Sequence, residues 1–208
     1  MTPNDSTTPF GAAFERAIAA LDAVNAQDPN RLSHAGESRP KELVHSELAT
    51  YWVRQLESDP SEALLLAARG HHLRRWQLPR SEYPEGRPGY LRWRKQLQQR
   101  HAQETGEILR EAGYDDSMAE RVGDIIRKRG LGLGLDPAVQ TLEDALCLVF
   151  VETQLGDFAA RYPDEKVVDV LTKSLKKMSE AGRAAAGRIE LPAAQRELLA
   201  RSVAALST

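Results

Sequence analysis

The chain contains a single cysteine, Cys147, among its 208 residues. One thiol cannot form an intramolecular disulfide or a zinc site made of several cysteines, so both kinds of scaffold are excluded. Long apolar runs are also missing: the longest uncharged apolar stretch, Ala145–Val151, is far shorter than the ~20 residues that a membrane-spanning helix needs. The N-terminus has neither the basic start nor the apolar core of a signal peptide. We therefore predict a cytoplasmic protein with no membrane partner.

Strong charge of one sign is absent as well, because the formal net charge is only −2. Such a balance gives no global attraction to nucleic acid or to anionic lipid, so any anion site must be local. Apolar residues make up 41% of the chain, enough for one sizeable core. We expect a tail at residues 1–9, disordered because it is short and polar, and a single domain at residues 10–208.

Apolar residues recur at helical spacing along the chain, and no stretch shows a convincing strand pattern. Capping residues, prolines and glycines divide the pattern into segments. The sequence predicts an all-α fold, a single bundle of about eight helices. The expected helices cover Phe10–Ala26, begin at Pro40, run from Asp59 to Trp76, cover Tyr90–Ala112, and begin near Ser117, Asp136, Asp164 and Pro192.

Polar side chains that can bind metal fall on helix faces that are otherwise apolar. His45 shares its face with Leu48 and Trp52, and Asp144 shares its face with Leu148. A buried carboxylate is costly unless it is paired or metal-bound. We expect the metal ligands to be His45, His71, His72 and Asp144. The alternative is that the histidines are core residues with satisfied hydrogen bonds and that Asp144 forms a cap or a local pair.

The order of these residues resembles the HD-domain superfamily of metal-dependent phosphohydrolases. The segments that carry the resemblance are Glu42 to Ser46, Ala67 to Leu73 with its histidine doublet, the helix that begins at His101, and Leu142 to Asp144. The resemblance covers about residues 40–152 and implies an HD-like helical bundle. It also implies a divalent metal that activates water for attack on phosphorus.

The chain departs from the HD pattern at the second residue of the doublet, which is His72 instead of Asp. In dinuclear relatives that Asp bridges two ions, and where many of them have a further His this chain offers only Lys128 nearby. The resemblance therefore implies at most one ion. Three imidazoles and one carboxylate suit Fe, Mn, Co, Ni or Zn. Glu42 or Glu143 is expected to serve as the base, and His101, with Glu104 on the same face, as an acid or base.

Cations are concentrated between Arg69 and Arg100, a segment that contains nine basic and only two acidic residues. Eight of the nine are arginines, interleaved with tryptophans and tyrosines, and guanidinium groups bind phosphate through two hydrogen bonds at once. We expect this segment to hold a phosphorylated ligand, and the residues expected to bind it are Arg74, Arg75, Arg80 and Arg94. The alternative is a solvated loop whose arginines pair with acidic helices.

The sequence thus favours a metal-dependent phosphohydrolase acting on a small phosphorylated metabolite or a nucleotide. Two alternatives remain open: a non-catalytic module that binds a nucleotide or RNA on a degenerate HD scaffold, and an HD-type iron oxygenase. The stretch from His72 to Pro84 is also similar to a family of uncharacterised bacterial and fungal proteins, some labelled glutamyl-tRNA synthetase. No nucleotide-binding strand-loop-helix pattern supports that label here.

Overall fold

The fold is mainly helical, as predicted, in a computed structural model that describes residues 10–206. The expected tail at residues 1–9 lies outside the described residues. The elements in chain order are α1 (Ala12–Asn25), β1 (Arg31–His34), β2 (Glu37–Pro40), α2 (Lys41–Leu56), α3 (Glu62–Gly70), η1 (Arg75–Gln77), η2 (Arg80–Glu82), α4 (Gly86–Glu111), α5 (Asp116–Ile126), α6 (Pro137–Thr153), α7 (Leu155–Arg161), α8 (Asp164–Leu175), α9 (Glu180–Ala186) and α10 (Ala193–Ala204). No helix in the described range is both long and apolar enough to cross a membrane.

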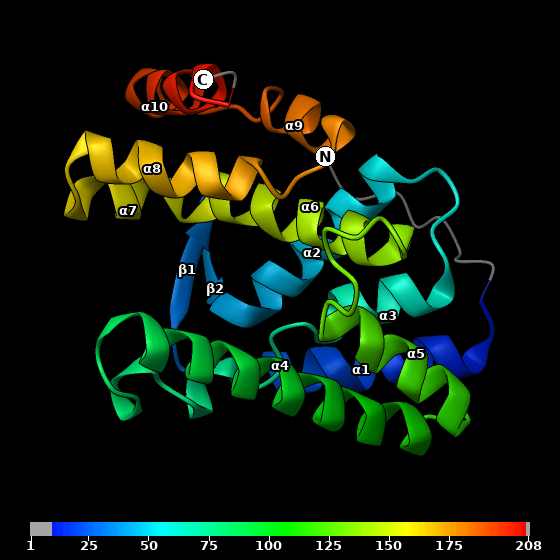
Figure 1. The fold of residues 1–208 in the computed structure, drawn as a ribbon. Helices are drawn as coiled ribbons and strands as arrows, with labels where there is room; N and C mark the ends of the chain where they lie inside the picture. Colours follow the sequence, from blue (N-terminus) through cyan, green and yellow to red (C-terminus); the bar gives the residue numbers. More distant parts are fainter. Residues whose placement is uncertain (1–9, 207–208) are drawn as a thin grey trace.

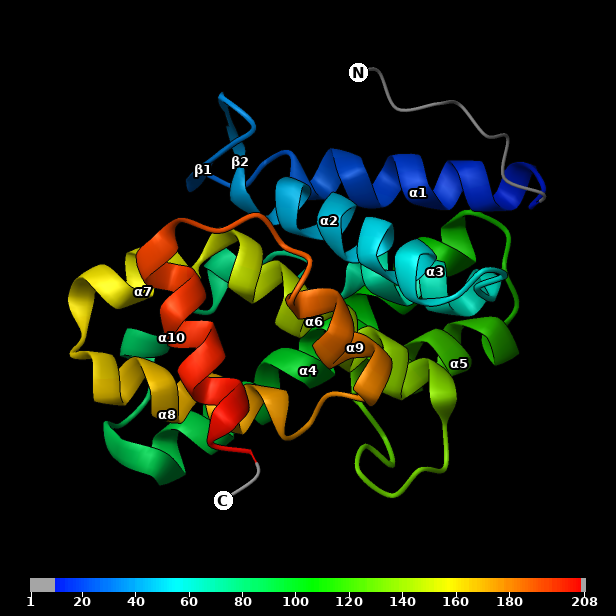
Figure 2. The same cartoon turned by 90° about the horizontal axis from the view of Figure 1, so that it is seen from above.

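Helix α3 forms the centre of the core. Its residues from Leu64 to Ala68 are fully buried, because the segment is apolar on all sides and suits only an interior position. It packs against α1, α2, α4, α5 and α6. Figures 1 and 2 show α4 on one side of this core, and α9 and α10 on the opposite side, beyond α6 and α8.

A short antiparallel hairpin precedes α2, in a stretch where the sequence predicts no strand. Strands β1 and β2 pair from Arg31 with Pro40 to His34 with Glu37. Their residues are mostly polar, so hydrophobic alternation gives no signal. The turn produces the hairpin. Ala35 and Gly36 both adopt positive φ, at 51° and 83°, and this geometry matches the twist of the two strands that a two-residue turn connects.

Several helix boundaries differ from the predicted ones because other residues provide the caps. The side chain of Ser61 caps α3, and the side chain of Asp115 caps α5 by accepting from Met118 N. Helix α3 ends at Gly70 instead of Trp76, and the following turn places Arg74 at a φ of 50°. Helices α7 and α9 were not predicted, since seven residues are too few to show a helical period.

Candidate metal and anion site

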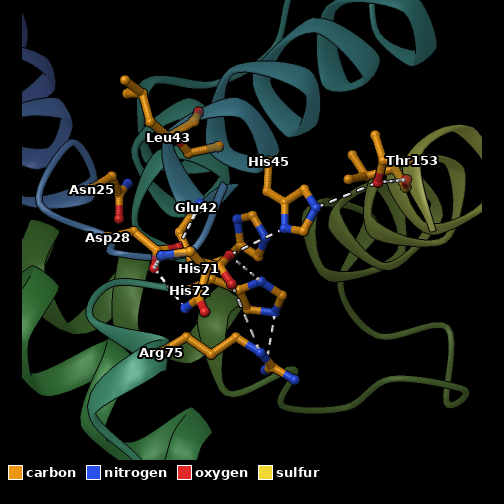
Figure 3. Close-up of polar contacts among 12 residues, drawn as sticks. Asn25, Asp28, Glu42, Leu43, His45, His71, His72, Arg75 and Thr153 are labelled. Atoms are coloured by element: carbon orange, nitrogen blue, oxygen red, sulfur yellow. Dashed lines mark hydrogen bonds and ion pairs between the residues drawn. The ribbon is translucent and has the colours of Figure 1, made fainter. Parts of the chain in front are cut away.

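A buried carboxylate lies at the centre of the site. Glu42 is in the first turn of α2 and is 4% exposed. Its Oε2 lies 3.2 Å from Nδ1 of His45, one turn later, and 3.1 Å from Nδ1 of His72, which follows α3 (Figure 3). Burial alone would raise the pKa of Glu42, but His72 and the two hydrogen bonds outweigh burial and hold this pKa well below its usual value. Glu42 is therefore ionised and accepts a hydrogen bond from each imidazole.

Glu42, His45 and His72 form a group that is able to hold a metal ion. One ligand atom from each residue lies within 4.8 Å of the others. Two imidazoles and one carboxylate are donors that suit a divalent transition metal. Two of the predicted ligands, His45 and His72, are thus brought together, and Glu42 joins them in place of Asp144.

The other doublet residue, His71, presents one ring nitrogen with a free lone pair. Its Nδ1 lies 2.7 Å from the carbonyl oxygen of Ala68. A carbonyl only accepts, so Nδ1 carries the proton and Nε2 keeps its lone pair. Burial lowers the pKa of His71 to about 3, so the ring is neutral at pH 7.

His101 of α4 has the same arrangement, and its second nitrogen is left without a partner. Its Nδ1 donates to Leu73 O at 2.8 Å, while the buried Nε2 has no hydrogen-bond partner within the described part of the chain. Burial lowers the pKa of His101 to about 4. The ring centroid of His72 lies 4.1 Å from that of His71 and 5.8 Å from that of His101, so the three rings are contiguous.

A cavity of about 70 Å³ opens beside these rings. His71, His72 and His101 form part of its wall, and three cations form another part: Arg75, Arg94 and Lys128. This volume holds a few water molecules or one small polar group. The cavity therefore combines neutral imidazole acceptors with positive charge.

Arg75 links the cavity to the buried carboxylate. Its guanidinium lies 3.4 Å from Nε2 of His72 and 4.0 Å from Oε1 of Glu42 (Figure 3). One face of the guanidinium stacks on Trp93, 4.9 Å from the ring centroid. Burial lowers the pKa of Arg75, although the group remains charged at neutral pH. Arg94 is placed similarly over Tyr90, at 5.8 Å.

The other two arginines predicted to bind ligand have partners elsewhere. Arg74 forms an ion pair with Glu104 at 3.1 Å. Arg80 donates to the carbonyl oxygens of Tyr83 and Pro84 at 2.8 and 2.9 Å, which fixes the loop before α4. Of the four predicted arginines, the structure brings Arg75 and Arg94 to the cavity.

Asp144 and Glu143 of α6 are occupied by contacts of their own. Oδ1 of Asp144 accepts from Ser179 N at 3.0 Å and from Gln140 Nε2 at 2.9 Å, and Oδ2 accepts from the Ser179 hydroxyl. Ser179 caps α9, so Asp144 ties α6 to the start of that helix. Glu143, predicted as a base, forms an ion pair with Lys128, a residue that lines the cavity.

The family described as a domain of unknown function, DUF4202, matches residues 15–199, which is most of the chain. No curated protein and no solved structure matches the chain.

Proposed function

Because the chain belongs to the DUF4202 family, whose description assigns no function, we propose a function from the site alone. We propose that the protein is a metal-dependent phosphohydrolase with one divalent ion. Its substrate would be a small phosphorylated metabolite or a nucleotide. One observation carries the proposal. The group formed by Glu42, His45 and His72 adjoins a small cavity with three cations in its wall.

The donor set supports a transition metal, such as Fe, Mn, Co, Ni or Zn, over Mg²⁺ or Ca²⁺, which prefer oxygen ligands. Glu42 supplies an ionised carboxylate, and burial lowers the pKa of His72 so that its imidazole is neutral. Metal ligands must be deprotonated in this way. The unpartnered Nε2 of His101 adds a buried acceptor beside the group.

The cations support a phosphorylated substrate. Arg75, Arg94 and Lys128 approach the cavity from three different segments: η1, α4 and the residues after α5. Guanidinium and ammonium groups form strong, charge-assisted hydrogen bonds with phosphoryl oxygens. The cavity has room for the phosphoryl group itself, and the remainder of the substrate would lie outside it, toward Tyr90 and Trp93.

Each residue then has a distinct role. When bound, a divalent ion lowers the pKa of a coordinated water and so supplies a nucleophile at neutral pH. Arg75 and Arg94 bind the phosphoryl oxygens, and the stacked aromatic rings hold both guanidinium planes in place. His101 Nε2 accepts a hydrogen bond from water in the cavity and orients it. Glu143 positions Lys128.

The experiment is a screen of phosphomonoesters and nucleotides with the purified chain. Each divalent ion is supplied separately, and released phosphate is measured. We expect phosphate release that requires a transition metal and is lost in Glu42→Gln. The matched control is Glu47→Gln, on the same helix, where the carboxylate pairs with Arg39; this variant should keep full activity.

Two outcomes would contradict the proposal. Saturable nucleotide binding without phosphate release, whatever metal is supplied, would identify a binding module. Phosphate release that survives in Glu42→Gln would place the activity elsewhere in the chain.

A further inference from the structure

A second hollow lies on the opposite side of the molecule, between α9 and α10. These two helices follow one another in the chain and lie on the outer face of the fold (Figure 2). The hollow has a volume of about 550 Å³, which is within the range of small-molecule sites. Its wall is mainly aliphatic: Ala186, Ile189, Leu191, Leu199 and Val203 are among its residues.

Two arginines provide the polar part of this hollow. Arg183 and Arg196 both line it, and no acidic residue does. Among the described residues, neither arginine has a carboxylate within 4 Å, whereas many other arginines of the chain are paired, such as Arg69 with Asp22. One nitrogen of each guanidinium is held by a backbone carbonyl: Met178 O accepts from Arg183 and Leu191 O from Arg196. Both cations are thus positioned, and their other guanidinium nitrogens have no hydrogen-bond partner among residues 10–206.

We propose that this hollow binds an aliphatic carboxylic acid, with the chain against the leucine and valine side chains and the carboxylate at Arg183 and Arg196. Charge complementarity selects an anion, because both lining charges are positive. The guanidinium fork matches the two oxygens of a carboxylate. The apolar wall selects an alkyl chain over a sugar or an inorganic ion.

The size of the hollow argues against a protein partner. Eleven residues line it, whereas a stable protein interface uses about 20 to 30 residues on each side. A neighbouring hollow of about 630 Å³ shares Arg183, Ala184 and Val203 with it, but Lys176 and Glu180 also line that hollow, so the apolar wall does not continue into it. The site is separate from the cavity at His72, so its test is independent of hydrolysis.

The test is calorimetric titration of the full chain with sodium decanoate below its micelle concentration. We expect one saturable site, and at least tenfold weaker binding of the neutral analogue decanol. Arg183→Gln combined with Arg196→Gln should weaken decanoate binding about tenfold. Val203→Glu changes an exposed residue, which leaves the core intact and places a negative charge against the ligand, so binding should be lost.

The matched control is Arg201→Gln, on the same helix α10 but paired with Asp164; it should bind decanoate as the unmodified chain does. Chemical-shift changes at the Leu199 and Val203 methyl groups should accompany binding. Several results would overturn the proposal: no saturable binding, equal affinity for decanol, no effect of Val203→Glu, or association only with vesicles of anionic lipid.

Discussion

Oε2 of Glu42 lies 3.1 Å from Nδ1 of His72, a residue 30 positions later in the chain. Glu42 lies at the start of α2 and His72 lies in the turn after α3. The packing of α2 against α3 brings the two side chains together. An ionised carboxylate with little exposure is stable only when hydrogen bonds replace its lost hydration. His72 and His45 provide them, which gives the site a fixed negative charge before any ion binds.

The metal-free protein should lose stability as the pH falls from about 6.5 toward 4. His71 and His101 titrate near 6.5 when unfolded, but burial lowers their pKa values to about 3 and about 4 in the fold. Below pH 6.5 the unfolded chain therefore binds protons that the native chain does not. Each group should contribute a slope of up to about 1.4 kcal/mol per pH unit. Urea denaturation with a chelator present, repeated across this pH range, measures the slope.

His71→Gln should reduce the dependence of stability on pH by the contribution of one histidine, which is up to about 1.4 kcal/mol per pH unit. His34→Gln is the comparison variant, because it removes a histidine that lies in the hairpin, near Glu152, and does not line the cavity. A stability that does not vary between pH 4 and pH 6.5 would show that these histidines are not buried in neutral form.

Arginine variants should divide into two classes. Arg75→Ala and Arg94→Ala should weaken binding of a phosphorylated ligand by about 1.5 to 3 kcal/mol, because each removes a charge-assisted hydrogen bond. Arg74→Ala and Arg80→Ala should lower the melting temperature without changing ligand binding. Arg74 forms an ion pair with Glu104, and Arg80 donates hydrogen bonds to the loop before α4. Measuring both quantities on all four variants tests the division, and equal binding losses in both classes would contradict it.

Asp144→Asn should act on stability and leave metal binding unchanged. The carboxylate accepts three hydrogen bonds, two of them from Ser179. Loss of its charge and of one acceptor should lower the free energy of unfolding by about 1 to 3 kcal/mol. Denaturant unfolding and metal titration of the same variant separate the two effects. A loss of metal affinity with unchanged stability would return Asp144 to the ligand set that the sequence predicts.

Gly70→Ala should destabilise the fold and displace the histidine doublet. A Cβ at position 70 would collide with the side chain of Thr105, whose hydroxyl donates to Gly70 O at 3.3 Å. Overpacking of this kind typically costs about 1 to 3 kcal/mol. Gly11→Ala is the control, because nothing lies within 4 Å of its Cβ position. Thermal melting compares them, and equal melting temperatures would contradict the close packing of α3 on α4.

The helical fold class could be predicted from the sequence, because amphipathic segments such as α5 and α8 leave a clear period of 3.6 residues. The hairpin could not, since its residues are polar and its geometry depends on positive φ at Ala35 and Gly36. The start of α5 was misplaced because Asp115 and Ser117 are both good caps, and only the packing selects Asp115.

The site was predicted in part. His45 and His72 were expected as ligands from their places in the sequence and from the resemblance to HD domains, and Arg75 and Arg94 were expected as anion binders from the cluster of cations around them. Glu42 was expected as a base, although its place one turn before His45 also allowed a shared ligand set. The contacts of Asp144 with Ser179 could not be predicted, because they depend on α9, a helix too short to leave a pattern.

The most direct measurement is the transition-metal content of the chain, determined by elemental analysis after reconstitution with each divalent ion and gel filtration. We expect about one ion per chain for the unmodified protein and for Glu47→Gln. We expect Glu42→Gln to lose that ion, because the central carboxylate is then neutral. Absence of bound metal in the unmodified protein, or full retention in Glu42→Gln, would contradict the claim that Glu42, His45 and His72 form a metal site.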